Sequence, residues 1–87
     1  MKKEDIKLVL TCGACPEQYD AYDKNGKDIA YLRLRGGVFR VDCPFGGETV
    51  YMKFFDDGWK GIFDYNEREE YLNIAKEKIC EYYNKGE

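Results

Sequence analysis

Two glycine-containing tetrapeptides limit most strongly how this chain can fold. "KNGK" at 24–27 and "RGGV" at 35–38 each separate runs in which apolar and polar residues alternate. Asn-Gly and Gly-Gly are typical of two-residue β-hairpin loops, because both central residues of such a loop need a positive φ angle. Strands joined by tight turns lie side by side and antiparallel. The sequence therefore predicts a β-meander.

The predicted strands alternate as half-buried strands should, and a helical period follows them. The strands are expected at about residues 6–11, 17–23, 28–35, 38–43 and 49–55. Beyond residue 66, apolar residues recur at spacings of three and four: Tyr71, Leu72, Ala75, Ile79, Tyr82 and Tyr83. This spacing indicates an amphipathic helix over about residues 67–84. Asn66 is its expected N-cap, with Glu69 completing a capping box.

Together these elements predict an α+β fold. Residues 1–87 form a single domain, an antiparallel meander of four to five strands with one C-terminal helix packed on one face. If Gly36-Gly37 is a two-residue loop, Arg33 lies opposite Arg40 and Leu34 lies opposite Phe39. Alternation then places one set of side chains under the helix: Tyr19, Ala21, Leu32, Leu34, Phe39 and Val41. The uncovered face is expected to carry Gln18, Asp20, Tyr22, Ile29, Tyr31, Arg33, Arg35, Arg40 and Asp42.

The uncovered face holds the candidate binding residues. They are Tyr31, Arg33, Arg35 and Arg40, with Asp20 and Tyr22 beside them. Like charges directly opposite each other on a sheet destabilise it by up to about 1 kcal/mol. Two interpretations follow. Either Asp20 and Asp42 neutralise the arginines in an ordinary salt-bridged surface, or an anionic ligand or partner does, since arginine suits bidentate recognition of phosphate and carboxylate.

Composition narrows the possible partners. The net charge of −3 and a pI near 5.0 argue against non-specific binding to nucleic acid or to an anionic membrane. The basic start of the chain is followed by too short an apolar run for a signal peptide, and no window approaches a membrane span. We therefore expect a cytoplasmic protein with reduced thiols and no membrane partner.

The four cysteines form a weak metal motif. "CGAC" places Cys12 and Cys15 at metal-ligand spacing, but a structural zinc site needs four ligands and the chain has no histidine. In the meander, Cys43 is expected about 15–20 Å away, at the opposite end of the sheet. Cys80 is expected to pack in the helix as a small buried side chain. No metal site and no cofactor are expected.

Catalytic groups are sparse. The chain has neither histidine nor serine, so the most common general base and hydroxyl nucleophile are missing, and the sequence favours a non-enzymatic protein. "GWKG" at Gly58–Gly61 matches the loop of KH domains, but a strand and not a helix precedes it. Trp59 is instead expected to anchor its loop by packing on the helix or the sheet edge.

Four segments resemble a family of small proteins encoded by phages and prophage-bearing bacteria. They are "CGACPEQYD", "YLRLRGGVFRVDCP", "GGETVY" and "EREEYLNIAKEKI", and the resemblance covers residues 12–79. It implies a phage or mobile-element context, in which small proteins often bind host machinery, including defence systems. It implies no particular activity, so no functional residue is carried over.

The sequence thus favours a small non-enzymatic binding module that uses its uncovered sheet face. Its partner would be a host protein, in the host cell cytoplasm, or an anionic small ligand such as a nucleotide. One alternative is a nucleic-acid-contacting accessory protein, with Tyr31 stacking on a base and the arginines on phosphates. Another is an inhibitor of a host defence system. A thiol redox or zinc protein using Cys12 and Cys15 is the less favoured alternative.

Overall fold

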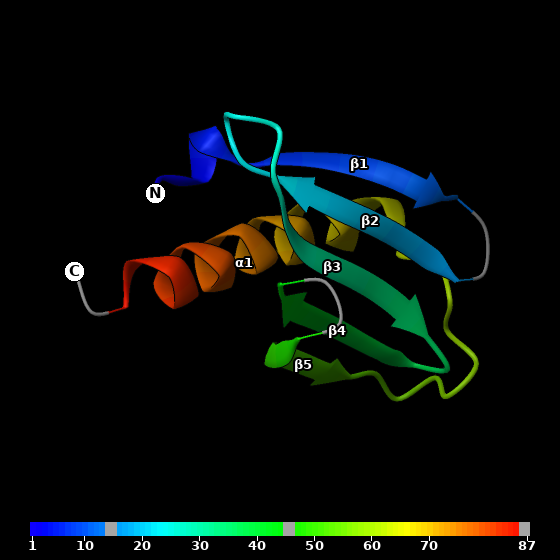
Figure 1. Cartoon of the computed structure of the whole chain (residues 1–87). Coiled ribbons are helices and arrows are strands. Elements are labelled where there is room, and N and C mark those ends of the chain that lie inside the picture. Colours follow the sequence, from blue (N-terminus) through cyan, green and yellow to red (C-terminus); the bar gives the residue numbers. More distant parts are fainter. Residues whose placement is uncertain (14–15, 45–46, 86–87) are drawn as a thin grey trace.

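The described residues fold as a five-stranded antiparallel sheet followed by one long helix, which confirms the predicted α+β meander (Figure 1). The computed structural model describes residues 1–13, 16–44 and 47–85. Its elements are a short 3-10 helix η1 (Lys3–Asp5), strands β1 (Lys7–Cys12), β2 (Glu17–Tyr22), β3 (Asp28–Arg35), β4 (Val38–Cys43) and β5 (Glu48–Phe54), and helix α1 (Tyr65–Asn84). The strands lie in the sheet in the order in which they follow each other in the chain.

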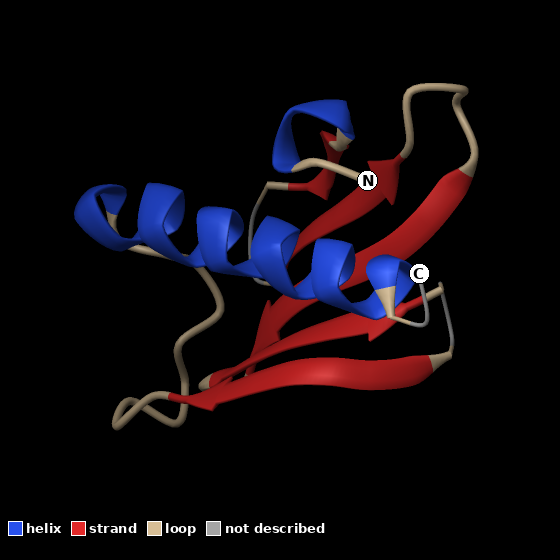
Figure 2. Ribbon diagram, turned by 90° about the vertical axis from the view of Figure 1, so that its left-hand side faces the viewer, coloured by secondary structure: helices blue, strands red, loops and turns tan. Residues whose placement is uncertain are grey.

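Helix α1 lies across one face of the sheet (Figure 2). Ala75 and Ile79 are fully buried, and Leu72 and Tyr83 pack partly buried against the same core. These residues belong to the apolar stripe that the sequence predicts. At the end of the helix, Asn84 binds Met1: its Oδ1 accepts a hydrogen bond of 2.8 Å from the terminal ammonium group. The N-terminus is thereby held beside the C-terminal end of α1.

The helix begins two residues earlier than the sequence predicts, and the expected N-cap is wrong. Asp64 is the N-cap in place of Asn66, and its backbone N–H donates to Glu67 Oε1 at 2.9 Å. Lys60 Nζ forms ion pairs with both carboxylates, at 2.5 Å from Glu67 Oε1 and 3.5 Å from Asp64 Oδ2. Phe63 is buried immediately before the cap, which fixes the point at which the chain enters the helix. Tertiary packing therefore selects Asp64 and Glu67 over Asn66 and Glu69 as the capping pair.

The turn at Gly36-Gly37 has the predicted register. Arg33 lies opposite Arg40, and Leu34 lies opposite Phe39. Both glycines have positive φ angles, 59° and 77°, as a two-residue loop of this type requires. The side chains on the two sides of β3 and β4 are therefore divided as the sequence predicts.

The turn that contains Asn25-Gly26 has one residue more than predicted. Asp23 N–H donates to Lys27 O at 2.9 Å, so the loop consists of Lys24, Asn25 and Gly26. The Asp23 carboxylate accepts hydrogen bonds from Asn25 N and Lys27 N, at 2.8 and 3.0 Å. A side chain that satisfies two loop amides stabilises the three-residue loop over the two-residue one.

The extra loop residue is offset by a bulge at Ile29. Tyr22 pairs with Asp28, whereas Ala21 pairs with Ala30, so Ile29 has no partner across the strand pair. Ile29 is buried in the core, and its predicted place on the uncovered face is wrong. The physical reason is the bulge, which turns two successive side chains towards the same side. Beyond the bulge the predicted register returns.

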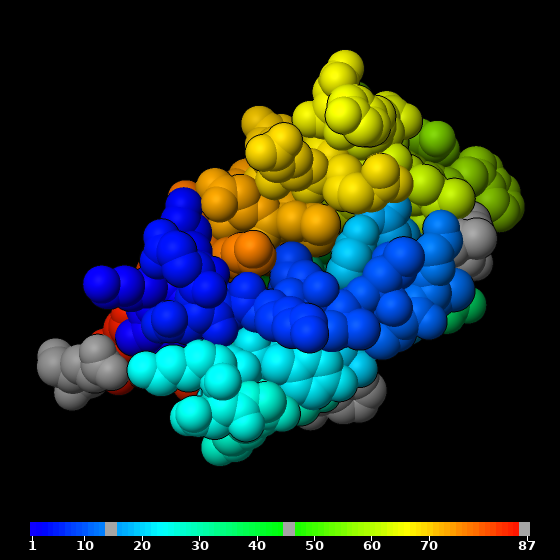
Figure 3. Space-filling model, turned by 90° about the horizontal axis from the view of Figure 1, so that it is seen from above, coloured from blue at the N-terminus to red at the C-terminus, as the bar shows by residue number. Residues whose placement is uncertain are grey.

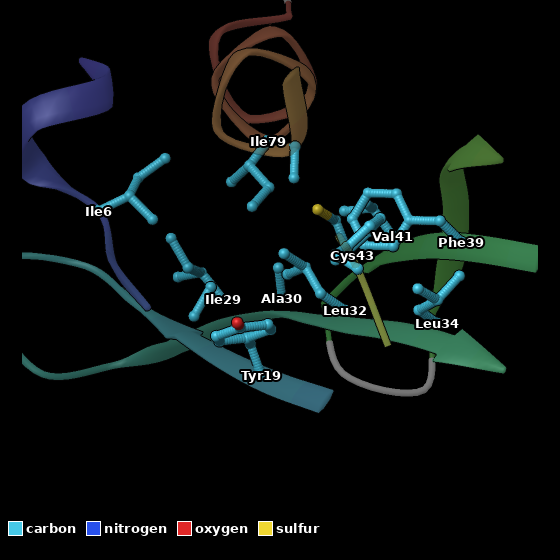
Figure 4. Packing of buried hydrophobic residues seen from close by; sticks show 13 residues of the cluster. Ile6, Tyr19, Ile29, Ala30, Leu32, Leu34, Phe39, Val41, Cys43 and Ile79 are labelled. Atoms are coloured by element: carbon cyan, nitrogen blue, oxygen red, sulfur yellow. The ribbon is translucent and has the colours of Figure 1, made fainter. Parts of the chain in front are cut away.

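The core lies between the sheet and α1 (Figure 4). Leu32, Leu34, Phe39 and Val41 come from the two central hairpin strands, and Ile79 reaches them from the helix. All of them are almost fully buried. Phe63 extends the core towards the start of α1, with its ring 5.0 Å from that of Phe39 in an edge-on contact. This layer fixes the sheet whose other face carries the candidate site.

A buried carboxylate joins the sheet to the start of the helix. Glu17 accepts hydrogen bonds from Arg68 Nε at 2.9 Å, Arg68 Nη2 at 3.0 Å, Phe63 N at 3.1 Å and Tyr19 Oη at 2.5 Å. Burial alone would raise the pKa of Glu17, but these hydrogen bonds outweigh it and hold the pKa below its ordinary value. Burial and the bond to Glu17 raise the pKa of Tyr19 to about 12.

Truncation of Ile79 tests the packing of the helix. Ile79→Ala removes a fully buried side chain and leaves a cavity, so the free energy of unfolding should fall by about 2–5 kcal/mol. Thermal and urea unfolding measure it. Glu70→Ala, on the exposed side of α1, is the matched control and should change stability by less than about 0.5 kcal/mol. Equal midpoints for the two variants would contradict the packing.

Replacement of Glu17 tests the buried ion pair through its pH dependence. Because the pKa of Glu17 is lower in the folded chain, its contribution is complete above the ordinary value of 4.5 and is lost as pH falls through the folded value. Glu17→Gln should therefore be less stable than wild type at neutral pH and should lose less stability on acidification. Urea unfolding between about pH 7 and pH 3 measures both slopes. Parallel curves would contradict the low pKa.

Candidate binding surface on the open face of the sheet

The face of the sheet opposite α1 brings all the predicted site residues together. We call it the open face, since no helix of the described part of the chain lies over it (Figure 1). Tyr31, Arg33, Arg35 and Arg40 lie on it with Asp20 and Tyr22, as the strand registers require. The same registers add Val9, Gln18, Val38, Asp42, Met52 and Phe54.

Cross-strand rows divide the open face into two halves. The row Val9–Asp20–Tyr31–Asp42 carries two acids, and Asp28 lies beyond it, opposite Tyr22. The next row towards the Gly36-Gly37 turn is Gln18–Arg33–Arg40–Met52, and the last is Arg35–Val38–Phe54. These last two rows contain three arginines and no acid. We call them, together with Trp59 in the adjoining loop, the cationic half.

Arg40 is neutralised by Asp42. Its Nε lies 3.2 Å from Asp42 Oδ2, and Thr49 Oγ1 donates to Asp42 Oδ1 at 2.7 Å. Asp42 is buried although it belongs to the open face, because these neighbours enclose it. The salt-bridge interpretation therefore holds for this arginine.

Asp20 does not neutralise the other two arginines. Its charge acts instead on Tyr22: after burial, the charges of Asp20 and Asp28 raise the pKa of that phenol. Within the described ranges, Arg33 and Arg35 form no ion pair, and Arg35 is exposed. The structure thus leaves two positive charges on the cationic half without a carboxylate partner from residues 1–13, 16–44 and 47–85.

Exposed apolar side chains lie beside these charges, and the sequence analysis missed them. Met52 is 45% exposed, Phe54 67% and Trp59 91%. Met52 lies opposite Arg40 and Phe54 opposite Val38. Extending the register of the Gly36-Gly37 hairpin by one more strand would have placed both on the open face. The alternation in β5 was the available signal.

The expected packing of Trp59 is wrong, because the loop that carries it is anchored by other groups. Gly37 N donates to Lys60 O at 2.8 Å, and Phe55 N donates to Gly37 O at 2.7 Å. A Cβ atom on Gly37 would lie 2.5 Å from Asp57 O, so only glycine permits this approach. Phe63 fills the adjacent core position. Trp59 is left in solvent at the end of the open face.

A hollow of about 450 Å³ lies at this end of the sheet. Its lining includes Gln18, Arg35 and Trp59, with Pro16 and Gly61. An unpaired guanidinium and an indole ring therefore border the same space. Groups of this kind suit a partner that presents both a carboxylate or phosphate and an apolar or planar group.

The cysteines do not come together among the described residues. Cys12 pairs with Gln18 near the Gly36-Gly37 end, whereas Cys43 pairs with Glu48 at the other end. Burial raises the pKa of Cys43 to about 12, which keeps it a thiol at neutral pH. Cys80 is half-buried against the core, and Cys15 lies outside the described residues. Among the described residues, no three cysteine, aspartate or glutamate side chains lie close enough together to hold a metal ion.

Among residues 1–13, 16–44 and 47–85, no helix is both long and apolar enough to span a bilayer. Comparison with protein-family models, with curated proteins and with solved structures finds no match to this chain.

Single substitutions should separate the two kinds of arginine. Arg40→Gln leaves the buried Asp42 without its cation, so the free energy of unfolding should fall by about 1–3 kcal/mol. Arg33→Gln removes the repulsion between Arg33 and Arg40, and it breaks no ion pair among the described residues. The free energy of unfolding should therefore stay the same or rise by up to about 1 kcal/mol. Urea unfolding of both variants checks this. Equal losses would show that Arg33 also has a stabilising partner.

Proposed function

We propose that this protein is a non-enzymatic binding module whose cationic half binds an acidic surface of another protein. The observation that supports it is the position of two unpaired arginines beside exposed apolar side chains. Arg35 borders the same hollow as Trp59 and shares a cross-strand row with Phe54, and Arg33 lies in the neighbouring row. Arginine, tryptophan, phenylalanine and methionine are the residues that protein interfaces concentrate at their centres.

The cost of the arrangement favours a partner. Arg33 and Arg40 are direct cross-strand neighbours, and the part of their repulsion that Asp42 does not offset destabilises the free protein by less than about 1 kcal/mol. Phe54 and Trp59 are largely exposed to water, so burial of their rings does not stabilise the free protein. A partner that supplies carboxylates and an apolar surface would offset both terms at once.

A protein partner suits the open face better than nucleic acid does. Tyr31, the proposed stacking residue, lies in the row that contains Asp20 and Asp42, and its hydroxyl donates to Gln18 Oε1 at 2.8 Å. A phosphate backbone that crossed Tyr31 would meet those carboxylates. The net charge of −3 opposes it further.

A small anionic ligand is the second candidate, favoured by the hollow beside Trp59. A nucleotide has a flat base for the indole ring and phosphates for Arg35, and these two side chains border the same space. This binding would use one end of the open face and would leave Met52 outside the contact.

The biological setting is a separate part of the proposal and rests on the resemblance to phage-encoded proteins. The partner would be a bacterial host protein, for example a component of a defence system. Binding would take place in the host cytoplasm. The chemistry of the cationic half requires only that the partner present acidic side chains around an apolar centre.

Paired substitutions test the proposal without disturbing the core. Arg33→Gln/Arg35→Gln removes two charges from the cationic half, and Phe54→Ser removes an apolar anchor. Both variants should lose a host protein that the wild-type chain captures from bacterial lysate, while their melting temperatures stay within about 4 °C of wild type. Mass spectrometry identifies the captured protein and any bound nucleotide.

Lys24→Gln/Lys27→Gln is the matched control, because it removes the same charge from the exposed loop at the other end of the sheet. It should retain the partner. With the purified partner, emission of the single tryptophan should shift to shorter wavelength, since Trp59 is 91% exposed in the free chain. An undiminished capture by Arg33→Gln/Arg35→Gln would contradict the proposal. A response to nucleotide alone would favour the second candidate.

A further inference from the structure

Strand β1 presents an apolar edge that the rest of the described chain leaves open. It is the first strand in the order of the sheet, and it pairs with β2 on its inner side. Leu10 is 52% exposed and Val9 37%. Seen from above, the N-terminal segment with β1, in blue, runs across the middle of the surface that faces the viewer (Figure 3). A strand of this kind is a template for pairing with a further strand.

The two edges of the sheet differ in how they are protected. Natural edge strands usually carry charged residues, lysine above all, that block pairing with other chains. The edge strand β5 carries Glu48 near its start and Lys53 near its end. In β1 the single charged residue is Lys7, at the first position, and the next three are Leu8, Val9 and Leu10. β1 therefore carries fewer charges than β5 to oppose pairing with another strand.

The sequence of β1 is complementary to itself. In "KLVLT" at 7–11, Val9 has a leucine on each side and then a polar residue on each side. If Val9 lies opposite Val9 of an antiparallel second copy, Leu8 lies opposite Leu10 and Lys7 opposite Thr11. No like charges meet in this register, and every apolar residue faces another. A two-fold axis requires this kind of self-complementary surface.

The helix side of β1 supplies room for the leucines. A groove of about 500 Å³ lies between β1 and the first half of α1. Leu8, Leu72 and Tyr65 line it, and Tyr65 is exposed. Leu8 and Leu10 lie on the helix side of β1, because Leu8 pairs with the buried Ala21 and Leu10 with the buried Tyr19. Leu10 of a second copy, placed opposite Leu8, would lie at the mouth of this groove.

We propose that β1 is a homodimerisation strand, which pairs antiparallel with β1 of a second copy about a two-fold axis at Val9. The pairing continues the sheet from one copy into the other and satisfies the outward backbone groups of both edge strands. Side chains that lie opposite each other in an antiparallel pair point to the same side of the sheet. The open faces of the two copies would therefore lie on the same side of the joined sheet, which twists from one copy to the other.

Opposite charges at position 9 test the register. In Val9→Lys, two lysines would lie directly opposite each other across the two-fold axis, and in Val9→Glu two glutamates would. We expect wild type to sediment as a dimer, each variant alone as a monomer, and an equal mixture of the two as a heterodimer. Native mass spectrometry identifies the heterodimer. Far-UV circular dichroism shows whether each variant is folded, since Val9 is partly exposed in the free chain.

Phe54→Lys is the matched control, because it adds the same charge to the opposite edge strand at a more exposed position. It should remain a dimer. The proposal is overturned if wild type stays monomeric up to about 1 mM, or if Val9→Lys self-associates as wild type does. Hydrogen exchange of wild type gives a test without substitution. Amides of β1 should exchange more slowly in concentrated than in dilute solution, and equal rates would likewise overturn it.

Discussion

The buried ion pair between Glu17 and Arg68 determines how the parts of this protein fit together. Glu17 stands at the start of β2, and its carboxylate accepts four hydrogen bonds, two of them from Arg68 at 2.9 and 3.0 Å. Burying a carboxylate is unfavourable unless such bonds satisfy it, and removal of one partner leaves an uncompensated buried charge. Since Phe63 N is among the donors, the pair holds the segment before α1 against the sheet as well as the helix itself. Sheet, connecting loop and helix therefore form one cooperative unit.

That unit also builds the end of the open face. The loop after β5 is held at one end by Gly37, which donates to Lys60 O and accepts from Phe55 N, and at the other by the bond from Glu17 N to Gly61 O. Between these anchors, Trp59 can only project outward, beside Arg35. The exposed indole is thus a consequence of the anchoring and not of a loose loop. A binding surface on rigid backbone loses little conformational entropy when a partner arrives.

The parts of the fold that local rules determine were the parts that the sequence could predict. Gly36-Gly37 permits one turn and one register, so the opposition of Arg33 and Arg40 followed from alternation alone. At Asn25-Gly26 the Asp23 carboxylate stabilises a longer loop, and the compensating bulge buries Ile29. Neither the longer loop nor the bulge changes the alternation of apolar and polar residues, so the sequence pattern cannot reveal them. The bond between Glu17 and Arg68 joins residues 51 positions apart, and Trp59 is exposed in a loop that backbone bonds to Gly37 and Glu17 hold in place. Such outcomes depend on tertiary competition between side chains.

Charge on the open face is separated along the strands, and this separation gives the proposed dimer a definite shape. The acidic row begins at Val9, on the proposed two-fold axis, and continues through Asp20 and Tyr31 to Asp42. The acidic rows of the two copies would therefore be collinear, with the cationic halves displaced to opposite sides of that line. With strands about 4.8 Å apart, arginines on β3 and β4 lie two and a half to three and a half strand spacings from the axis. Measured across the strands, the two cationic halves would then be about 25–35 Å apart, on the same side of one continuous, twisted sheet. That geometry suits an acidic partner that is itself two-fold symmetric or carries two acidic patches, because the second contact forms at a high effective concentration once the first is made.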